Sequence, residues 1–396
     1  MDAAGAPGPA RAKVRADEAV ARHRDLLFSV SHTIWEHPEL CFEEHRAHDL
    51  LVEVLAGAGL APTPHAHGLP TAFVAEAGTE GPCVAVLLEY DALPDIGHAC
   101  GHNVIAAAGL GAGLALAELA DEMGGRVRII GTPAEEGGGG KEFLIRAGAF
   151  EGVDAAMMVH PADRDLPTMR AIAIQRLEVT YHGVASHAAA APELGRNALD
   201  AAVLGYVNVA ALRQHIGDGE RIHGIFTEAG EKPNIVPRRA AAEWYVRSDT
   251  TGSLAALQPR VLACLEAGAH AAGCSMEHTW QDPAYADLVD DPWLLAAWVA
   301  NATALGRPPL DPAEVGHVVG STDMGNVSHL VPSIHPMLQV APRGVSIHTP
   351  EFAGFARGPE GDRAVVDGAV LMAHTALDRW AAGPTPATEP LPTAIP

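Results

Sequence analysis

The chain has 396 residues. This is longer than the chain that a single hydrophobic core usually organises, so two domains are expected. Lys and Arg number 26 against 49 Asp and Glu, a formal net charge of -23, which argues against nucleic acid or an anionic membrane surface as a partner. The hydrophobic share of 48% and the aromatic share of 5% are typical of an Ala-rich soluble globular protein.

The cysteines and the N-terminus indicate a cytoplasmic protein. Five cysteines are scattered without framework spacing, and the sequence after Met1 has no apolar signal core. Both features suit a reducing compartment. The segment 104–120 is the only candidate membrane span, but its glycines, Glu118 and the acidic residues that follow favour a buried helix.

The first half of the chain predicts helices on either side of short strands. Apolar residues recur at helical spacing from Val14 to Glu36, and a second helix is expected over about 42–58. A strand follows at 72–75, and the apolar run 84–88 is short enough for a buried strand. A long Ala/Gly/Leu helix is expected over 104–120.

A polar stretch, Glu89 to Asn103, lies between the strand 84–88 and this helix. In an open α/β sheet, ligands bind at the carboxyl ends of the strands. Cys100 and His102 stand two apart, with Asp91 close by, and these donors suit Zn²⁺ or a neighbouring transition metal. A buried thiol beside a helix-capping histidine would leave the same pattern.

Two adjacent carboxylates follow the next predicted strand, 126–131. Glu135 and Glu136 lie in a loop with four glycines. Neighbouring residues of an extended loop point in opposite directions, so one carboxylate can bind a metal while the other faces its water as general base. A solvated acidic turn is the alternative. A phosphate loop is disfavoured, because no Gly-Lys-Ser/Thr ending follows and the glutamates would repel phosphate.

A third strand, 155–159, ends in His160. Three successive buried strands therefore each end in a residue type that binds metals, and a metal site is predicted where they end. The chain then changes character over 174–286, where the order β-α-β-β-α-β indicates a ferredoxin-like insertion. A helix over about 293–305, the polar loop 320–328, His348 and a final helix over about 362–380 follow.

These elements predict an α/β protein with a mixed-sheet domain that has helices on both faces and carries an inserted α+β ferredoxin-like domain. The expected boundaries are 14–173 and 287–380 for the two parts of the mixed-sheet domain and 174–286 for the insertion. Residues 1–13 and 381–396 are expected to be disordered tails.

Six short motifs, in this order along about residues 14–380, resemble the aminoacylase and carboxypeptidase G family of dinuclear metallopeptidases. Within it the chain resembles the amidohydrolase subgroup of hippurate, auxin-conjugate and aminobenzoyl-glutamate hydrolases. The motifs are Asp91-Ala-Leu-Pro with Gly97-His-Ala-Cys-Gly-His-Asn, Pro133-Ala-Glu-Glu-Gly-Gly-Gly-Gly, Val159-His-Pro, Ala185-Ser-His-Ala, Pro233-Asn-Ile-Val-Pro and His348-Thr-Pro.

The resemblance implies two divalent metal ions per subunit, Zn²⁺ or Mn²⁺, with Co²⁺ or Ni²⁺ also suited to the donors. The wider family usually carries a His-x-Asp where this chain has Glu89-Tyr90-Asp91, so His102 takes over as ligand and Asp91 orients it. Glu135 is implied as general acid and base and Cys100 as the bridge. The implied metal ligands are Cys100, His102, Glu136, His160 and His348.

The resemblance also assigns the insertion a role as dimer interface and lid. His187 is implied to reach the metal site of the partner subunit in a homodimer and to stabilise the oxyanion. Asn234 and Arg247 are implied to hold the carboxylate of a small-molecule amide substrate, although surface arginines on strands are common.

The expected activity is metal-dependent hydrolysis of the amide bond of N-acyl or N-aroyl amino acids, or of dipeptide-like substrates such as aminobenzoyl-glutamate. A thiol amidase that uses Cys100 is one alternative. The other is a non-catalytic metal-binding homologue, against which the pair Glu135 and Glu136 argues, since a structural metal site has no use for a spare carboxylate.

Overall fold

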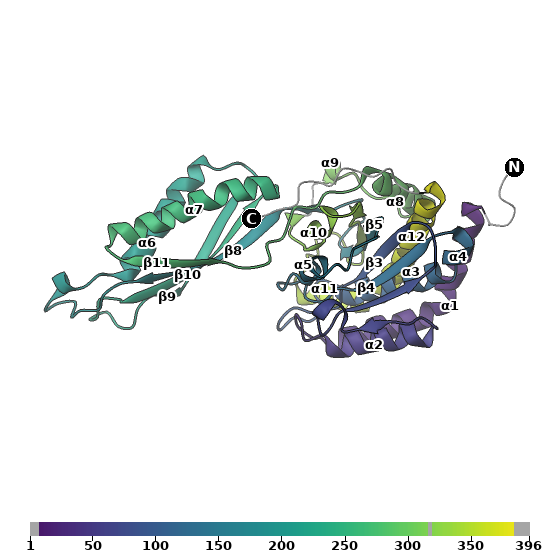
Figure 1. The fold of residues 1–396 in the computed structure, drawn as a ribbon, viewed down its shortest axis with the longest axis horizontal. Coiled ribbons are helices and arrows are strands. Elements are labelled where there is room, and N and C mark those ends of the chain that lie inside the picture. The colour runs from purple at the N-terminus through teal and green to yellow at the C-terminus, as the bar shows by residue number, and fades with distance from the viewer. Residues whose placement is uncertain (1–7, 316–318, 384–396) are drawn as a thin grey trace. The chain divides into compact units, whose positions relative to one another are not determined.

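A computed structural model describes residues 8–315 and 319–383, which form two compact units (Figure 1). One unit is Ala171–Asp287, and the described residues 8–170, 288–315 and 319–383 form the other. Residues 1–7 and 384–396 of the predicted tails lie outside the described residues. Residues 9–13, predicted in the tail, are instead helical, because Pro9 suits a first helical turn and Ala12 packs into the core.

The first unit is built on a mixed six-stranded sheet. Strands β4, β3, β5 and β13 are parallel, and β2 runs antiparallel to β4. The prediction of a mixed α/β sheet is therefore confirmed. In spatial order the strands are β1 (Thr63–Pro64), β2 (Phe73–Ala77), β4 (Arg126–Gly131), β3 (Cys83–Leu88), β5 (Ala155–Met157) and β13 (Ser333–Ile334).

Helices cover both faces of this sheet (Figure 1). Successive side chains of a strand point to opposite faces. Val84 and Val86 of β3 accordingly lie in one core, with helices α1 (Pro9–Glu36), α3 (His102–Ala117) and α12 (Pro359–Ala382). Ala85 and Leu87 lie in another core, with α5 (Gly140–Arg146) and α10 (Met324–Ser328). Burial on both faces explains why β3 is a continuous apolar run.

Several helices differ from the predicted pattern, among them α10, which lies within the predicted loop 320–328. Helix α2 (His45–Gly57) begins three residues later than expected, because Phe42 has a left-handed backbone with φ of 63°. Helix α11 (Pro350–Arg357) was not predicted, and Thr349 caps it by accepting the Phe352 N–H at 3.2 Å. Other helices and strands of this unit include α4 (Ala120–Met123), α8 (Pro292–Ala304), α9 (Pro312–Val315), β6 (His160–Ala162), β12 (Val319–Gly320) and β14 (Met337–Gln339), and the two-residue strand β7 (Arg170–Ala171) leads into the second unit.

The second unit confirms the predicted β-α-β-β-α-β order. Its four strands form one antiparallel sheet in the order β11-β8-β10-β9. The helices pack on one face of this sheet (Figure 1), against a core that includes Val179, Trp244 and Val246. The elements are β8 (Ala173–His182), α6 (Ala198–Leu212), β9 (Arg221–Glu228), β10 (Arg239–Ser248), α7 (Thr251–Ala271) and β11 (Ser275–Trp280).

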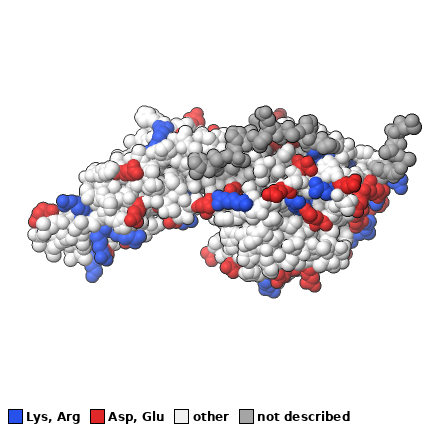
Figure 2. All heavy atoms as spheres, in the orientation of Figure 1, with Lys and Arg blue, Asp and Glu red and all other residues white. Residues whose placement is uncertain are grey.

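Charged side chains of both signs are interspersed over the face shown in Figure 2. Over residues 8–315 and 319–383, every helix is too short or too polar to cross a bilayer. The segment 104–120, weighed above as a membrane span, forms the buried helix α3 up to Ala117.

Candidate metal centre

The parallel strands of the first unit end at one edge of the sheet. Leu88 at the end of β3 pairs with Gly131 at the end of β4, and Val86 pairs with Met157 at the end of β5. Because the carboxyl ends of parallel strands lie together, the segments that follow these three strands converge.

The first donor group that results is Cys100, His102 and His160. Each offers one ligand atom, all three are buried, and the three atoms lie within 4.8 Å of one another. The Cys100 Sγ lies 3.4 Å from His160 Nε2. Two donors of one tetrahedral zinc ion lie roughly 3.3–3.6 Å apart, given bonds of about 2.0–2.3 Å. The three side chains therefore have a spacing that suits one ion.

A second donor group shares the same thiol. Cys100, Glu136 and His348 also offer ligand atoms within 4.8 Å of one another, and His348 Nε2 lies 3.6 Å from Glu136 Oε2. The His348 N–H donates to the Ala99 carbonyl at 2.8 Å, which ties the histidine to the segment that carries the cysteine. The Cys100 thiol is therefore common to both donor groups.

Asp91 fixes both donor groups without entering either of them. Its Oδ1 lies 2.9 Å from His102 Nδ1, and its Oδ2 accepts the Glu136 backbone N–H at 2.9 Å. The imidazole is thus oriented with Nε2 towards the other donors. This is the usual position of a carboxylate that orients a metal-binding histidine.

The described residues leave several buried polar atoms of this site without a hydrogen-bond partner: Glu89 Oε2, His102 Nε2 and Glu136 Oε1. Such atoms are costly to bury unless something compensates them. Thiolate, imidazole and carboxylate together bind divalent transition metals. The residues therefore fit divalent metal ions.

Comparison with known proteins agrees with this chemistry. Residues 87–376 match the model of the peptidase family M20/M25/M40. The chain belongs to this family. It is therefore a hydrolase that acts on amide or peptide bonds.

The relatives of this M20 enzyme include two hydrolases of different substrates. It is 40% identical over 384 residues to the Xaa-Arg dipeptidase of Mus musculus, a match that covers 93% of this chain and 88% of that protein. It is 34% identical over 274 residues to one of the subunits of the p-aminobenzoyl-glutamate hydrolase of Escherichia coli, a match that covers 64% of this chain and 57% of that one.

A solved structure supports the fold. A dinuclear metal-binding peptidase of the M20 family from Bacillus subtilis superposes with a TM-score of 0.71 at 21% identity, covering 91% of this chain and 99% of that chain. At this identity the likeness concerns the fold alone.

Glu135 of the M20 enzyme lies beside the donor groups. Its Oε2 is 3.9 Å from His102 Nε2. Burial, followed by the charges of Glu89 and Glu136, raises the pKa of Glu135 well above its usual value. A carboxyl group in this setting holds a proton readily, which is what a general acid and base needs.

The loop that carries Glu135 is held by Glu44, the residue before helix α2. The backbone of Ala134 is left-handed, with φ of 61°, and its N–H donates to Glu44 Oε1 at 2.9 Å. Glu44 is fully buried and also accepts the Thr71 hydroxyl at 2.8 Å. This carboxylate therefore fixes the strained residue next to the candidate base.

Two of the three buried donors of the first group, His160 and Cys100, differ in protonation. Burial, and then the neighbouring His102, lower the pKa of His160 to about 4, so the ring is neutral and able to bind a metal. Burial and then the charge of Glu136 raise the pKa of the Cys100 thiol. A bound metal ion is what makes such a thiol a thiolate.

The three site residues predicted in the insertion belong to the second unit. There the structure brings His187 and Asn234 together, because the Ala188 N–H donates to the Asn234 carbonyl at 3.1 Å and His187 pairs with Ile235. Arg247 is on β10, where its guanidinium lies 5.8 Å from the ring centre of Tyr245. The donor groups lie in the other unit.

Sequence reasoning did not single out a buried ion cluster next to the donors. The Lys141 ammonium donates to Glu89 and, at 2.6 Å, to Asp323, and all three side chains are fully buried. The signal that could have identified Glu89 is its position directly after a buried strand, which is the same signal that pointed to the other donors.

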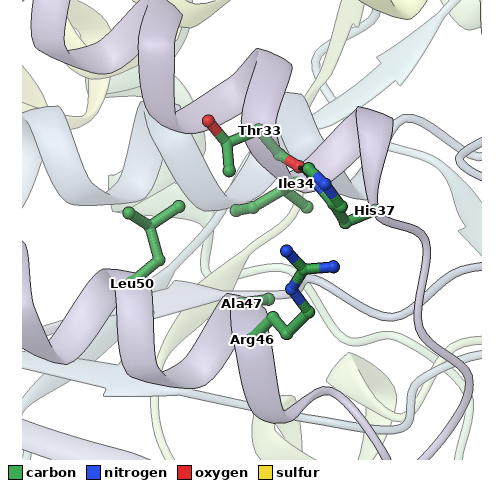
Figure 3. A pocket seen from close by; sticks show the side chains of 6 residues that line it. All are labelled: Thr33, Ile34, His37, Arg46, Ala47 and Leu50. Carbon is green, nitrogen blue, oxygen red and sulfur yellow. Dashed lines mark hydrogen bonds between the residues drawn. The ribbon is translucent and has the colours of Figure 1, made fainter.

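A small hollow lies away from this chemistry, between α1 and α2 (Figure 3). Its volume of about 20 Å³ is enough for roughly one water molecule. No predicted site residue lines it. Its lining residues are Thr33, Ile34, His37, Arg46, Ala47 and Leu50.

Proposed function

We propose that this enzyme is a dinuclear metal-dependent amidohydrolase. The observation that supports it best is the pair of donor groups joined by Cys100, with the Glu135 carboxyl directly beside them. When bound, divalent metal ions would polarise the scissile carbonyl and lower the pKa of a water molecule. The donors suit Zn²⁺ or Mn²⁺, and equally Co²⁺ or Ni²⁺.

The protein's own residues supply the proton transfers. Glu135 takes a proton from the attacking water, because its carboxyl faces the donors and is shielded from solvent. It then delivers this proton to the leaving amine. Asp91 keeps His102 and the Glu136 backbone in position throughout.

The proposed substrates are amides whose amine half carries a carboxylate. Both named relatives act on such compounds: a dipeptide ending in arginine, and p-aminobenzoyl-glutamate. Asn234 and Arg247 are the proposed carboxylate contacts, since the fork of an arginine matches a carboxylate.

Elemental analysis combined with chelation tests this proposal. We expect about two metal ions per chain and release of a free amino acid that stops on chelation and returns when metal is added. A panel of Xaa-Arg dipeptides, aminobenzoyl-glutamate and N-acyl amino acids would identify the substrate. Metal-free protein whose hydrolytic activity resists chelation would contradict the proposal.

A thiol amidase is the second candidate, because Cys100 Sγ lies 3.4 Å from the imidazole of His160. Its weakness is the raised pKa of the buried thiol, whereas a nucleophilic cysteine needs a lowered one. Loss of activity on alkylation, with no effect of a chelator, would favour this candidate. All five cysteines are free thiols, consistent with the proposed cytoplasmic location.

We also infer that the enzyme is a homodimer paired through its second unit. Strand β9 is at the edge of the sheet and exposes Ile225 (66%) and Phe226 (39%), while Val207 on α6 is 55% exposed. An edge strand with exposed apolar side chains is a template for pairing with another chain. Replacing Ile225 with lysine should give a monomer by light scattering; an unchanged mass would contradict this interface.

Mixing two inactive variants tests whether His187 acts on the partner's site. A heterodimer of His187→Ala and Glu135→Gln has one site with both residues intact only if His187 acts across the interface. Random subunit exchange should then restore roughly a quarter of the wild-type activity. If His187 acts within its own chain, the mixture stays inactive.

A further inference from the structure

The buried side chain of Glu89 is absent from the set of metal ligands described above, yet it faces the same histidine. Glu89 Oε2 lies 3.5 Å from His102 Nε2, closer than the carboxylate oxygens of Glu136 at 3.7 Å and Glu135 at 3.9 Å. Glu89, His102 and Glu135 also form a third group whose ligand atoms lie within 4.8 Å of one another.

The two oxygens of Glu89 have different surroundings. Oε1 accepts a hydrogen bond from Lys141, whose ammonium is anchored on its other side by Asp323. Oε2 is buried without a hydrogen-bond partner among the described residues. Lys141 therefore fixes the carboxylate with one oxygen satisfied and the other directed at His102.

The hydrogen bonding of His102 decides what that second oxygen can do. Asp91 occupies Nδ1, so His102 can bind a metal only through Nε2, the atom that faces Glu89. Once Nε2 binds a metal, it has no proton to donate to Glu89. Among the described residues, Oε2 then has no donor, so it either binds the same ion or remains a buried, unpaired carboxylate oxygen, which is strongly unfavourable.

The distance between Glu89 and His102 and the charges around them both favour binding of Glu89 Oε2 to the same ion. Two light donors of a tetrahedral zinc ion lie about 3.3 Å apart, given bonds of about 2.0–2.1 Å, close to the separation of 3.5 Å found here. Lys141 is a single positive charge between two buried carboxylates, Glu89 and Asp323, with Glu135 nearby. A cation at His102 would balance the excess negative charge.

We propose that Glu89 is a direct ligand of the metal ion bound by Cys100, His102 and His160, and that Lys141 and Asp323 hold it in place. This inference rests on the proposed dinuclear function. It gives this ion four protein donors, whereas the other has three: Cys100, Glu136 and His348.

The wild-type protein loaded with Zn²⁺ provides the direct test. A crystal structure should place a Glu89 oxygen at about 2.0–2.2 Å from one zinc ion. Two bound zinc ions with Glu89 beyond bonding distance would overturn this inference and leave the proposed function standing. Absence of bound zinc would overturn both.

A matched pair of variants gives an independent readout by zinc titration in competition with a chromophoric chelator. Glu89→Gln keeps an oxygen that can accept from Lys141, but it removes the carboxylate. We expect one of the two zinc ions to bind about 100-fold more weakly, at or beyond the upper end of the loss seen for residues that only support a ligand. Unchanged affinity for both ions would overturn the inference.

Asp323→Asn is the control, because Asp323 contacts Lys141 and belongs to none of the three donor groups. It should retain both ions with affinities within roughly 10-fold of the wild type. Equal losses in the two variants would show that the cluster acts only through its charge, and would contradict ligation by Glu89.

Discussion

Replacing Glu135 with glutamine is expected to lower kcat by ~10²–10⁴-fold while the protein keeps its fold and its metal ions. The amide has nearly the shape of the carboxyl group, but it accepts no proton from water. Glu135 belongs to neither of the two donor groups that share Cys100, so its loss should leave both ions bound. Steady-state kinetics and elemental analysis on the same sample would measure both quantities.

Glu136→Gln is the matched comparison, since the two glutamates are neighbours in one loop. Glu136 lies 3.6 Å from His348 and belongs to the second donor group, so this variant should lose metal as well as activity. Near-normal turnover by Glu135→Gln would refute its role as base. Loss of metal from Glu135→Gln would instead make it a ligand.

The strand ends that form the site could be predicted from sequence, because burial on both faces leaves a clear trace. Strand β3 is apolar throughout and is followed at once by Glu89, while β4 is apolar only towards its end and is followed by the loop that carries Glu135 and Glu136. Local sequence therefore located Cys100, His102 and Glu136 at one edge of a sheet. The structure brings these donors within 4.8 Å in groups of three.

Long-range pairings could not be predicted in this way. Lys141 and Asp323 are 182 positions apart, and nothing in the segment around either residue shows that the other neutralises it. Glu44 likewise accepts the N–H of Ala134, 90 positions away. That contact, with the left-handed turn at Phe42, also explains why helix α2 begins later than its apolar pattern indicates.

The role of His187 at the metal centre could not be predicted from the residues around it, for a different reason. A residue that acts on another copy of the chain makes its functional contacts only in the assembled dimer. The segment around His187 shows only a histidine among small residues. The proposed role therefore depends on the resemblance and on the mixing experiment.

Replacing Lys141 with methionine is expected to destabilise the metal-free protein by about 3–5 kcal/mol, the cost of leaving a buried ion pair with one partner. Lys141, Glu89 and Asp323 are all fully buried, so solvent cannot take over the role of the ammonium. Denaturant unfolding, followed by circular dichroism, measures the change in the free energy of unfolding. Lys13→Met is the control: its pair with Asp378 is partly exposed and should contribute about 0–1 kcal/mol.

The loss in Lys141→Met should also depend on pH. Even in the wild type, burial raises the pKa of Asp323 to about 6, against the opposing effect of Lys141, and removing the ammonium raises it further. A carboxyl group whose folded pKa lies above its unfolded value weakens the fold as pH rises through the folded pKa. The destabilisation should therefore be larger at pH 8 than at pH 5, where the Asp323 carboxyl takes up a proton. A loss below about 1 kcal/mol at both pH values would mean that the carboxylates find other partners, and that Lys141 is not what holds Glu89 towards His102.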